Sequence, residues 1–146
     1  MANYPISWKT GMGVNHVGAY QVSGRPFASG SITSVKTEGP VKIEFPFVTR
    51  WVEVINNDHS NPVRVAFSSA SILGTNYFRV GQAQTDKGKD GFPSTGKMEV
   101  KISEIWVSGS GAAAEVDVVA GLTAIRPESV SGSDGPSWSG SYDGVA

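Results

Sequence analysis

Short runs in which apolar and polar residues alternate are the main regular pattern of the chain, and the clearest lie between residues 41 and 69. A period of two places successive side chains on opposite faces of a β-strand, so each run has one apolar and one polar face. Pro46 and the turn-forming stretch 56–62 separate the runs. The pattern predicts three strands of a sheet that is buried on one face. The apolar members are Val41, Ile43 and Phe45; Val52 and Val54; and Val63, Val65 and Phe67.

Weaker runs continue this pattern along the chain, at residues 17–22, 29–36, 76–80, 98–108 and 115–123. Residues 69–75 can hold one helical turn, but no helical pattern is as strong as the strand pattern. Eight short strands joined by turns predict an all-β fold, and eight is the count expected for a single eight-stranded jelly-roll β-sandwich made of two Greek keys. An immunoglobulin-like sandwich of seven or eight strands fits the spacing nearly as well.

The run 98–108 changes phase partway along. Met98, Val100 and Ile102 share one face, whereas Ile105 and Val107 are displaced from that face by one residue. A β-bulge or a corner near Ser103 and Glu104 restores a common inward face, and such kinks occur where a strand passes from one sheet to another. The alternative is that Trp106 turns inward and the strand has no bulge.

The predicted core is formed by the large apolar members of the alternating runs. A register slip of one residue would place the opposite set inside, so the core and the strand register are one prediction. Truncation of Phe67 to alanine should therefore destabilise the domain clearly. The predicted core residues are Val52, Val54, Val65, Phe67, Val100, Ile102, Val118 and Leu122.

The less regular segments divide the chain into an N-terminal arm (1–15), a jelly-roll domain (16–125) and a Ser/Gly-rich C-terminal arm (126–146). Within the domain, residues 81–97 form a polar connection of 17 residues, which is longer than most loops of a compact domain. Large aromatic residues in such segments are usually buried against something, either the chain's own sandwich or a neighbouring subunit. The candidate subunit-interface residues are Trp8, Trp138, Tyr142 and Phe92.

Composition limits the functional classes. A chain of 146 residues with 39% hydrophobic content can form one domain with a real core. Its net charge of −1 argues against a nucleic-acid partner. It contains no cysteine for a disulfide or a thiolate metal site. The N-terminus has no signal-like pattern, and no apolar run is long enough for insertion into a membrane.

Two glycine-rich strings match nucleotide-binding motifs only in part. The stretch 91–97 has the spacing of a phosphate-binding loop, but Met98 stands where a magnesium-binding Ser or Thr is required. A strand follows it, so no helix N-terminus is predicted to receive phosphates. The stretch 109–114 precedes another strand and is interpreted as a tight hairpin turn. The sequence therefore predicts no cofactor.

Candidates for metal binding and acid–base chemistry are few. Asp86 and Asp90 imitate part of a calcium loop, but Lys97 occupies the place of its closing glutamate. His16 and His59 are the two histidines, and His59 lies among turn residues that could hold a surface cation or form a plain hydrogen-bonded turn. No Ser-His-acid arrangement stands out, and the glutamates lie mainly on outward faces or in turns. We expect neither a metal site nor an enzyme; a small enzyme has only generic support.

Three aromatic residues outside the predicted core carry a different hypothesis. Trp51, Trp106 and Tyr77 could form a platform for sugar rings, as in β-sandwich carbohydrate-binding modules. Trp and Tyr are also enriched at protein interfaces, because they bury a large area at a small entropic cost. We therefore expect these side chains in an interface or in the core, with sugar binding as the alternative.

Several phrases of the chain resemble one viral protein family. They extend over roughly the middle two thirds of the sequence and include no catalytic motif. The chain resembles the small single jelly-roll capsid proteins of large icosahedral DNA viruses of algae, the phycodnaviruses, and most of all their penton and minor capsid proteins. The phrases are Phe45–Arg50, the alternating strand that ends in Asn56, Val63–Ser68 and Asn76–Phe78, with outer limits at Gly24–Phe27 and Ala120–Thr123.

This resemblance implies a structural virion protein, most of all the penton at the five-fold vertex, with another minor capsid, cement or decoration role as the alternative. The implied partners are copies of the chain itself, as a homopentamer, and neighbouring major or minor capsid proteins. The implied location is the capsid of a particle assembled in the host cytoplasm.

Overall fold

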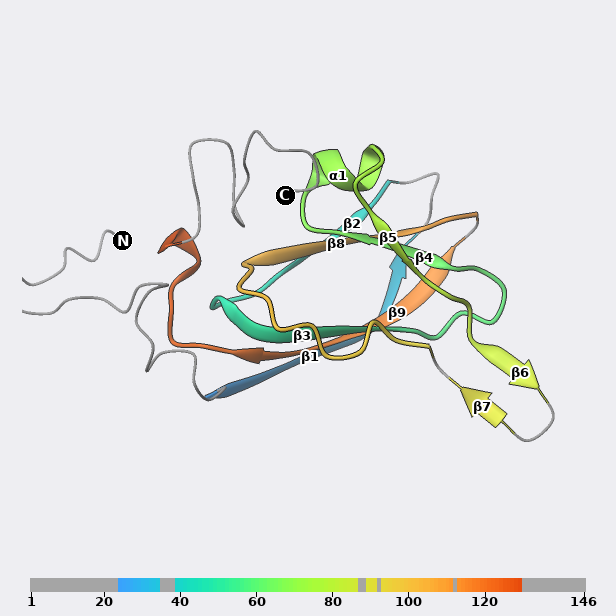
Figure 1. Ribbon diagram of the computed structural model, residues 1–146, viewed down its shortest axis with the longest axis horizontal. Helices are drawn as coiled ribbons and strands as arrows, with labels where there is room; N and C mark the ends of the chain where they lie inside the picture. The colour runs from blue at the N-terminus through green and yellow to red at the C-terminus, as the bar shows by residue number, and fades with distance from the viewer. Residues whose placement is uncertain (1–23, 35–38, 87–88, 92, 112, 130–146) are drawn as a thin grey trace, which may run out of the picture.

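Two antiparallel β-sheets face each other across a buried core in the computed structural model, which describes residues 24–34, 39–86, 89–91, 93–111 and 113–129 (Figure 1). The first, sheet A, has the strand order β1-β9-β3, and the second, sheet B, has the order β2-β8-β4-β5. An all-β sandwich is therefore confirmed. The strands are β1 (Arg25–Ser34), β2 (Val41–Glu44), β3 (Thr49–Asn56), β4 (Val63–Ala66), β5 (Phe78–Val80), β6 (Gln84–Asp86), β7 (Lys89–Gly91), β8 (Glu104–Gly109) and β9 (Ala114–Leu122).

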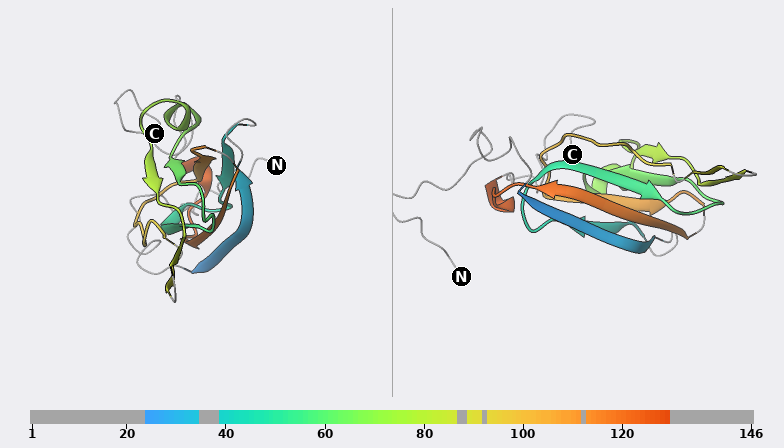
Figure 2. Two further views of the ribbon diagram at one scale, coloured as in Figure 1. Left: turned by 90° about the vertical axis from the view of Figure 1, so that its right-hand side faces the viewer. Right: turned by 90° about the horizontal axis from the view of Figure 1, so that it is seen from below.

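The core lies between the two sheets, where the apolar sides of the alternating strands meet (Figure 2). Six of the eight predicted core residues are buried: Val52, Val54, Val65, Ile102, Val118 and Leu122. Phe67 and Val100 are less buried than predicted. Both are partly buried and pack against the margin of the core. The strand register read from the period-two pattern is thus correct.

The predicted helical turn exists as α1 (Ser69–Leu73). Ser68 caps its N-terminus, because its hydroxyl accepts a hydrogen bond from the backbone N–H of Ser71. The helix packs against β4 and β8 on the outer side of sheet B (Figure 1). A second short element, the 3₁₀ turn η2 (Pro127–Ser129), follows β9.

A bend at Ser103 explains the phase change in residues 98–108 and confirms the predicted corner. Before the bend, Met98 pairs with Val52 at the edge of sheet A. After the bend, β8 runs through the middle of sheet B, with Ile105 and Val107 buried and Trp106 on the outer face. The regular strand is shorter than predicted, because the residues before the bend do not form a continuous ladder.

The predicted tight hairpin at residues 109–114 is wrong. β8 belongs to sheet B and β9 to sheet A, so this connection passes between the sheets. Gly111 meets another loop there, because an added Cβ would lie 3.1 Å from the Asn61 Oδ1 atom. A glycine-rich string before a strand therefore marks a close backbone approach here.

The polar connection predicted at 81–97 holds regular structure. It contains the hairpin β6-β7, and residues 93–102, here called the edge segment, then run along β3. The N–H groups of Asn56 and Val52 donate to the carbonyls of Pro93 and Met98, both at 2.9 Å. The edge segment thus covers the outer edge of β3, which would otherwise expose unpaired backbone groups.

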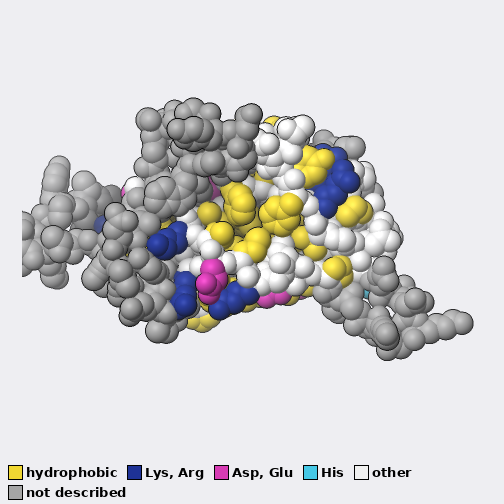
Figure 3. Space-filling view, in the orientation of Figure 1, with side chains coloured by type: hydrophobic (Ala, Val, Ile, Leu, Met, Phe, Trp, Pro, Cys, Tyr) yellow, Lys and Arg dark blue, Asp and Glu magenta, His cyan; other side chains and the backbone are white. Residues whose placement is uncertain are grey.

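Partly buried hydrophobic side chains lie where the edge segment and β5 border the two sheets. Figure 3 shows hydrophobic side chains gathered over this side of the molecule. Phe67 and Phe78 are neighbours, with ring centroids 6.2 Å apart. Met98 and Val100 of the edge segment are also partly buried and pack against the core.

Several sequence predictions fall outside the described residues. These are the strand at 17–22, the N-terminal arm and the C-terminal arm from residue 130 onward. The described chain remains bonded to the sandwich as far as Ile125, whose carbonyl accepts a hydrogen bond from the Val48 N–H at 2.9 Å. The domain boundaries at 15 and 125 stay predictions.

Candidate interaction surface

The four predicted interface residues, Trp8, Trp138, Tyr142 and Phe92, all lie outside the described residues. Their assignment to a subunit interface stays a prediction. The candidate surface of the described chain must therefore be found on the two outer faces of the sandwich and along its edges.

The predicted aromatic platform does not exist as one surface. Trp51 lies on the outer face of sheet A, whereas Trp106 and Tyr77 lie on the outer side of sheet B. A cation also lies over each ring. The Lys97 Nζ atom is 5.8 Å from the Trp51 centroid, the Lys42 Nζ atom is 5.9 Å from the Trp106 centroid, and the Arg64 Cζ atom is 4.6 Å from the Tyr77 centroid. The hypothesis of three rings gathered for sugar stacking is therefore wrong.

A depression of about 570 Å³ lies at one end of sheet B, where β2 ends and β8 begins. It combines charged side chains with an apolar margin. Its lining residues are Lys42, Glu44, Phe45, Pro46, Ser103, Glu104 and Pro127.

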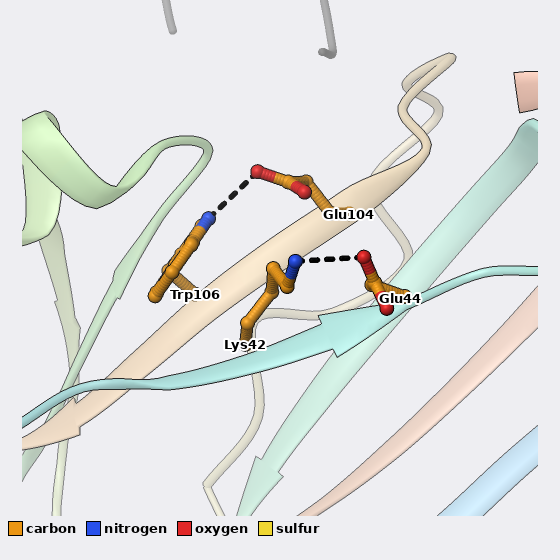
Figure 4. A network of polar contacts seen from close by, with 4 residues as sticks. All are labelled: Lys42, Glu44, Glu104 and Trp106. Carbon is orange, nitrogen blue, oxygen red and sulfur yellow. Dashed lines mark hydrogen bonds and ion pairs between the residues drawn. The ribbon is translucent and has the colours of Figure 1, made fainter. Parts of the chain in front are cut away.

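Two polar contacts organise this depression, and Figure 4 shows them on the neighbouring strands β2 and β8. The indole Nε1–H of Trp106 donates a hydrogen bond to Glu104 Oε1 at 2.9 Å. The ammonium of Lys42 forms an ion pair with Glu44 Oε1 at 2.7 Å. The two contacts lie side by side, because Lys42 is directly opposite Trp106 and Glu44 is directly opposite Glu104 in the β2–β8 ladder.

The electrostatic balance of the depression depends on Lys42. Two carboxylates directly opposite each other on adjacent strands repel, so a cation between them is favourable. The hydrogen bond to Glu44, helped by the charges of Glu44 and Glu104, raises the pKa of Lys42 above its ordinary value of 10.5. Lys42 is therefore charged at neutral pH. Glu104 is buried, whereas the side chain of Glu44 is largely exposed.

This arrangement is suited to polar contact with another molecule. It offers one exposed carboxylate, one ammonium and the apolar surface of Pro46 and Pro127. Such a mixture of charged rim and apolar surface is typical of protein contact sites.

No group of three or more His, Asp, Glu or Cys side chains that could hold a metal ion occurs among the described residues.

The turn around His59 is the hydrogen-bonded turn favoured from sequence. The Asp58 carboxylate accepts hydrogen bonds from the backbone N–H groups of Ser60 and Asn61, at 2.6 and 2.7 Å. Buried Asn56 donates to the carbonyls of Asn61 and Gly81 and accepts from the Asp58 N–H. The side-chain oxygen atoms of Asn56 and Asp58 thus accept hydrogen bonds from backbone N–H groups of this turn.

The string at 91–97 leads into the edge segment. Lys97 forms an ion pair with Glu99 at 3.4 Å, and Met98 continues into the bridge with Val52. In the described part of the chain, no helix directly follows the string. Its glycine at 96 has a positive φ of 67°, which suits a turn in the irregular edge segment.

The network of Lys42, Glu44, Glu104 and Trp106 was not predicted from the sequence. The signal was present, since Lys42 and Glu44, like Glu104 and Trp106, are two residues apart and thus share the polar face of a strand. The missing information was that β2 and β8 are neighbours although some 60 residues separate them in the sequence.

Comparison of the chain with family models, with curated proteins and with solved structures found no significant match. Within the described residues, no helix is both long and apolar enough to cross a membrane.

Proposed function

We propose that this protein is a non-enzymatic structural subunit of a virus shell, built on a single eight-stranded jelly roll. The observation that carries the proposal is the pairing order of the strands. With the edge segment counted as the sixth strand, the first pairs with the eighth (β1 with β9) and the second with the seventh (β2 with β8). The third then pairs with the sixth (β3 with the edge segment) and the fourth with the fifth (β4 with β5).

The eight strands can be viewed as one long hairpin of four strand pairs. Successive pairs along this hairpin lie in alternate sheets. Sheet A holds the first and third pairs, and sheet B holds the second and fourth. Two Greek keys rolled up in this way are a jelly roll, an architecture frequent in viral capsid proteins and lectins. The pairing thus supports the jelly roll over an immunoglobulin-like sandwich, and the phrases around Phe45–Arg50 and Val63–Ser68 that resemble algal virus capsid proteins support the shell role.

Within the shell we propose the penton position. A five-fold ring requires a heterologous contact, in which one surface of each subunit fits a different surface of the next. Trp8, Trp138, Tyr142 and Phe92 are the proposed aromatic anchors for such contacts, since buried aromatic residues dominate interface energies. The depression beside Lys42 and Glu44 is a proposed contact point for a neighbouring capsid protein.

The decisive experiment combines the oligomeric state with the position in the particle. Native mass spectrometry of the full chain should find pentamers at micromolar concentration, and antibody labelling of purified particles should mark the vertices. A strict monomer or trimer with label scattered over the shell would favour a minor capsid role. Absence of the protein from purified particles, together with a specific hit on a glycan array, would overturn the proposal in favour of a carbohydrate-binding module.

A truncated chain tests the proposed C-terminal arm. Deletion of residues 130–146 should leave the sandwich folded, because the chain is bonded to it up to Ile125, while incorporation into particles fails or vertices are lost. A matched control removes the aromatic anchors alone, with Trp138 and Tyr142 replaced by serine. Normal particles that carry the truncated chain at full occupancy would contradict the role of the arm.

A further inference from the structure

A second polar cluster lies on the outer side of sheet B, at its β5 edge and away from the depression. Arg64 of β4 and Arg79 of β5 are directly opposite each other in the ladder, and Tyr77 immediately precedes β5. Neither arginine lines the depression beside Lys42. The proposed shell role uses none of these three side chains.

The tyrosine ring holds the two guanidinium groups together. The Arg64 Cζ atom lies 4.6 Å from the ring centroid, and the Arg79 Cζ atom lies 5.7 Å from it. The Arg79 Nη2 group also donates a hydrogen bond to the Tyr77 hydroxyl oxygen at 3.3 Å. A guanidinium that stacks on a ring keeps in-plane N–H groups for an oxygen acceptor.

Among the described residues, no carboxylate forms an ion pair with Arg64 or Arg79. The ion pairs among the described residues join Lys42 to Glu44 and join Arg50 and Lys97 to Glu99, all away from the cluster. Like charges directly opposite each other on adjacent strands are unfavourable. In addition, the Arg64 Nε atom is buried and has no hydrogen-bond partner, and an unpaired buried donor is unfavourable as well.

The pKa of Tyr77 is consistent with the positive charge of the cluster. The hydrogen bond from Arg79, together with the charges of Arg64 and Arg79, lowers the pKa of Tyr77 below its ordinary value of 10.0.

The strand that carries the cluster is itself open on one side. β5 is the last strand of sheet B and pairs only with β4 among the described strands. Along β5, Phe78 faces the core margin beside Phe67, while Arg79 faces outward. In Figure 3, Lys and Arg side chains lie next to the hydrophobic side chains at the margin of this surface. An extended peptide added to this edge would present alternate side chains to an apolar and to a cationic surface.

We propose that Arg64, Tyr77 and Arg79 bind the carboxylate of an acidic side chain on an extended partner polypeptide that lies along β5. Two guanidinium groups match the planar, two-oxygen acceptor of one carboxylate. A nucleic acid is a poorer match, because its binding typically draws on about 6–10 phosphate contacts and this chain has a net charge of −1.

A simpler role for Arg79 is protection of an edge strand against aggregation, since charged residues commonly serve that purpose. That role needs only a charge at position 79. It needs neither the stacked ring nor the second arginine, and it leaves the buried Nε of Arg64 unpaired. The two roles differ in what the arginines do when an acidic peptide is supplied.

The test uses the isolated full chain, so its outcome is independent of the shell role. The probe is a blocked hexapeptide that alternates glutamate and valine, and the matched probe carries glutamine in place of glutamate. We expect saturable shifts of the β5 backbone amide signals and of the Arg64 Nε–H signal in nuclear magnetic resonance spectra. The glutamine peptide should bind about tenfold more weakly or worse, as expected for loss of a charged hydrogen-bond partner.

Variants and competing anions make the test decisive. Arg79→Gln should weaken binding of the glutamate peptide by about the same factor as replacing glutamate with glutamine in the peptide. Because Arg79 is exposed, this variant should fold even where Arg64→Gln does not. Arg25→Gln is the control, since Arg25 also stacks on a ring, that of Phe47 at 4.1 Å, but on a strand of sheet A. Equal binding of both peptides, tighter binding of inorganic sulfate, or tighter binding of a single-stranded oligonucleotide would each overturn the proposal.

Discussion

The carboxylate of Asp117 on β9 accepts a hydrogen bond from the backbone N–H of Ser31 on β1, at 2.8 Å. Ser31 has a φ of 54°, in the left-handed region that non-glycine residues rarely adopt. The β1–β9 ladder is irregular between Ser29 and Ile32, where β1 contains one residue more than β9. An added Cβ at Gly30 would lie 3.1 Å from the same carboxylate oxygen. One side chain thus holds a β-bulge that keeps both halves of β1 in register with β9.

We expect Asp117→Ala to lower the free energy of unfolding by about 1 kcal/mol, because the N–H of Ser31 loses its acceptor while the strained φ remains. Glu115→Ala is the control, since Glu115 lies two residues away on the same face of β9 and is exposed. It should change stability by less than about 0.5 kcal/mol. Urea unfolding measures both values, and equal effects of the two variants would show that the bulge does not depend on Asp117.

The edge segment should depend on one buried hydroxyl. Thr49 Oγ1 donates a hydrogen bond to the Val100 carbonyl at 2.7 Å and accepts one from the Ile102 N–H at 3.1 Å. Thr49→Val keeps the shape but leaves both backbone groups unpaired, at about 1–3 kcal/mol for each group. Thr49→Ser keeps the hydroxyl and loses one methyl group, at about 1 kcal/mol. The melting temperature of Thr49→Ser should therefore be higher than that of Thr49→Val. The reverse order would refute the role of the hydroxyl.

Truncations should separate the centre of the core from its margin. Ile105 is 0% exposed, so Ile105→Ala should cost about 2–5 kcal/mol. Leu73 is 74% exposed, and Leu73→Ala should change stability by less than about 0.5 kcal/mol. Phe67→Ala should fall between them, because Phe67 is only partly buried beside Phe78. A Phe67 effect as small as that of Leu73 would mean that the margin contributes little to the fold.

Local patterns in the sequence were sufficient to predict most strands and to predict which of their side chains face the core. The alternation of Val52 with Val54 and of Val63 with Val65 predicted the buried faces, and the phase change before Ile105 predicted the bend at Ser103. These features depend on neighbouring residues, whose geometry the strand period determines.

Features that depend on distant pairing could not be predicted. The hairpin expected after β8 was wrong because nothing local indicates that β8 and β9 lie in different sheets. Residues 93–97 of the edge segment were assigned to the polar connection because Thr95 bonds the Val54 N–H through its side chain, which leaves no alternating pattern there. The cluster at Tyr77 forms only when β4 and β5 pair across α1.

Tyr77 should make stability depend on pH in the alkaline range. Its pKa is lowered in the folded chain, chiefly by the hydrogen bond from Arg79, whereas the unfolded chain titrates near the ordinary value of 10.0. The folded state therefore releases the phenolic proton first, so this contribution to stability is absent at neutral pH, grows as the pH rises through the folded pKa, and is complete above the unfolded pKa.

Ultraviolet absorbance of the phenolate should reveal one early-titrating tyrosine that disappears in Tyr77→Phe and moves back toward its ordinary pKa in Arg79→Gln. Over the same pH range, the denaturant midpoint of the wild type should rise relative to that of Tyr77→Phe. A gap between the two proteins that stays constant with pH, or an early phenolate signal that survives in Tyr77→Phe, would show that the arginine pair does not act on this ring.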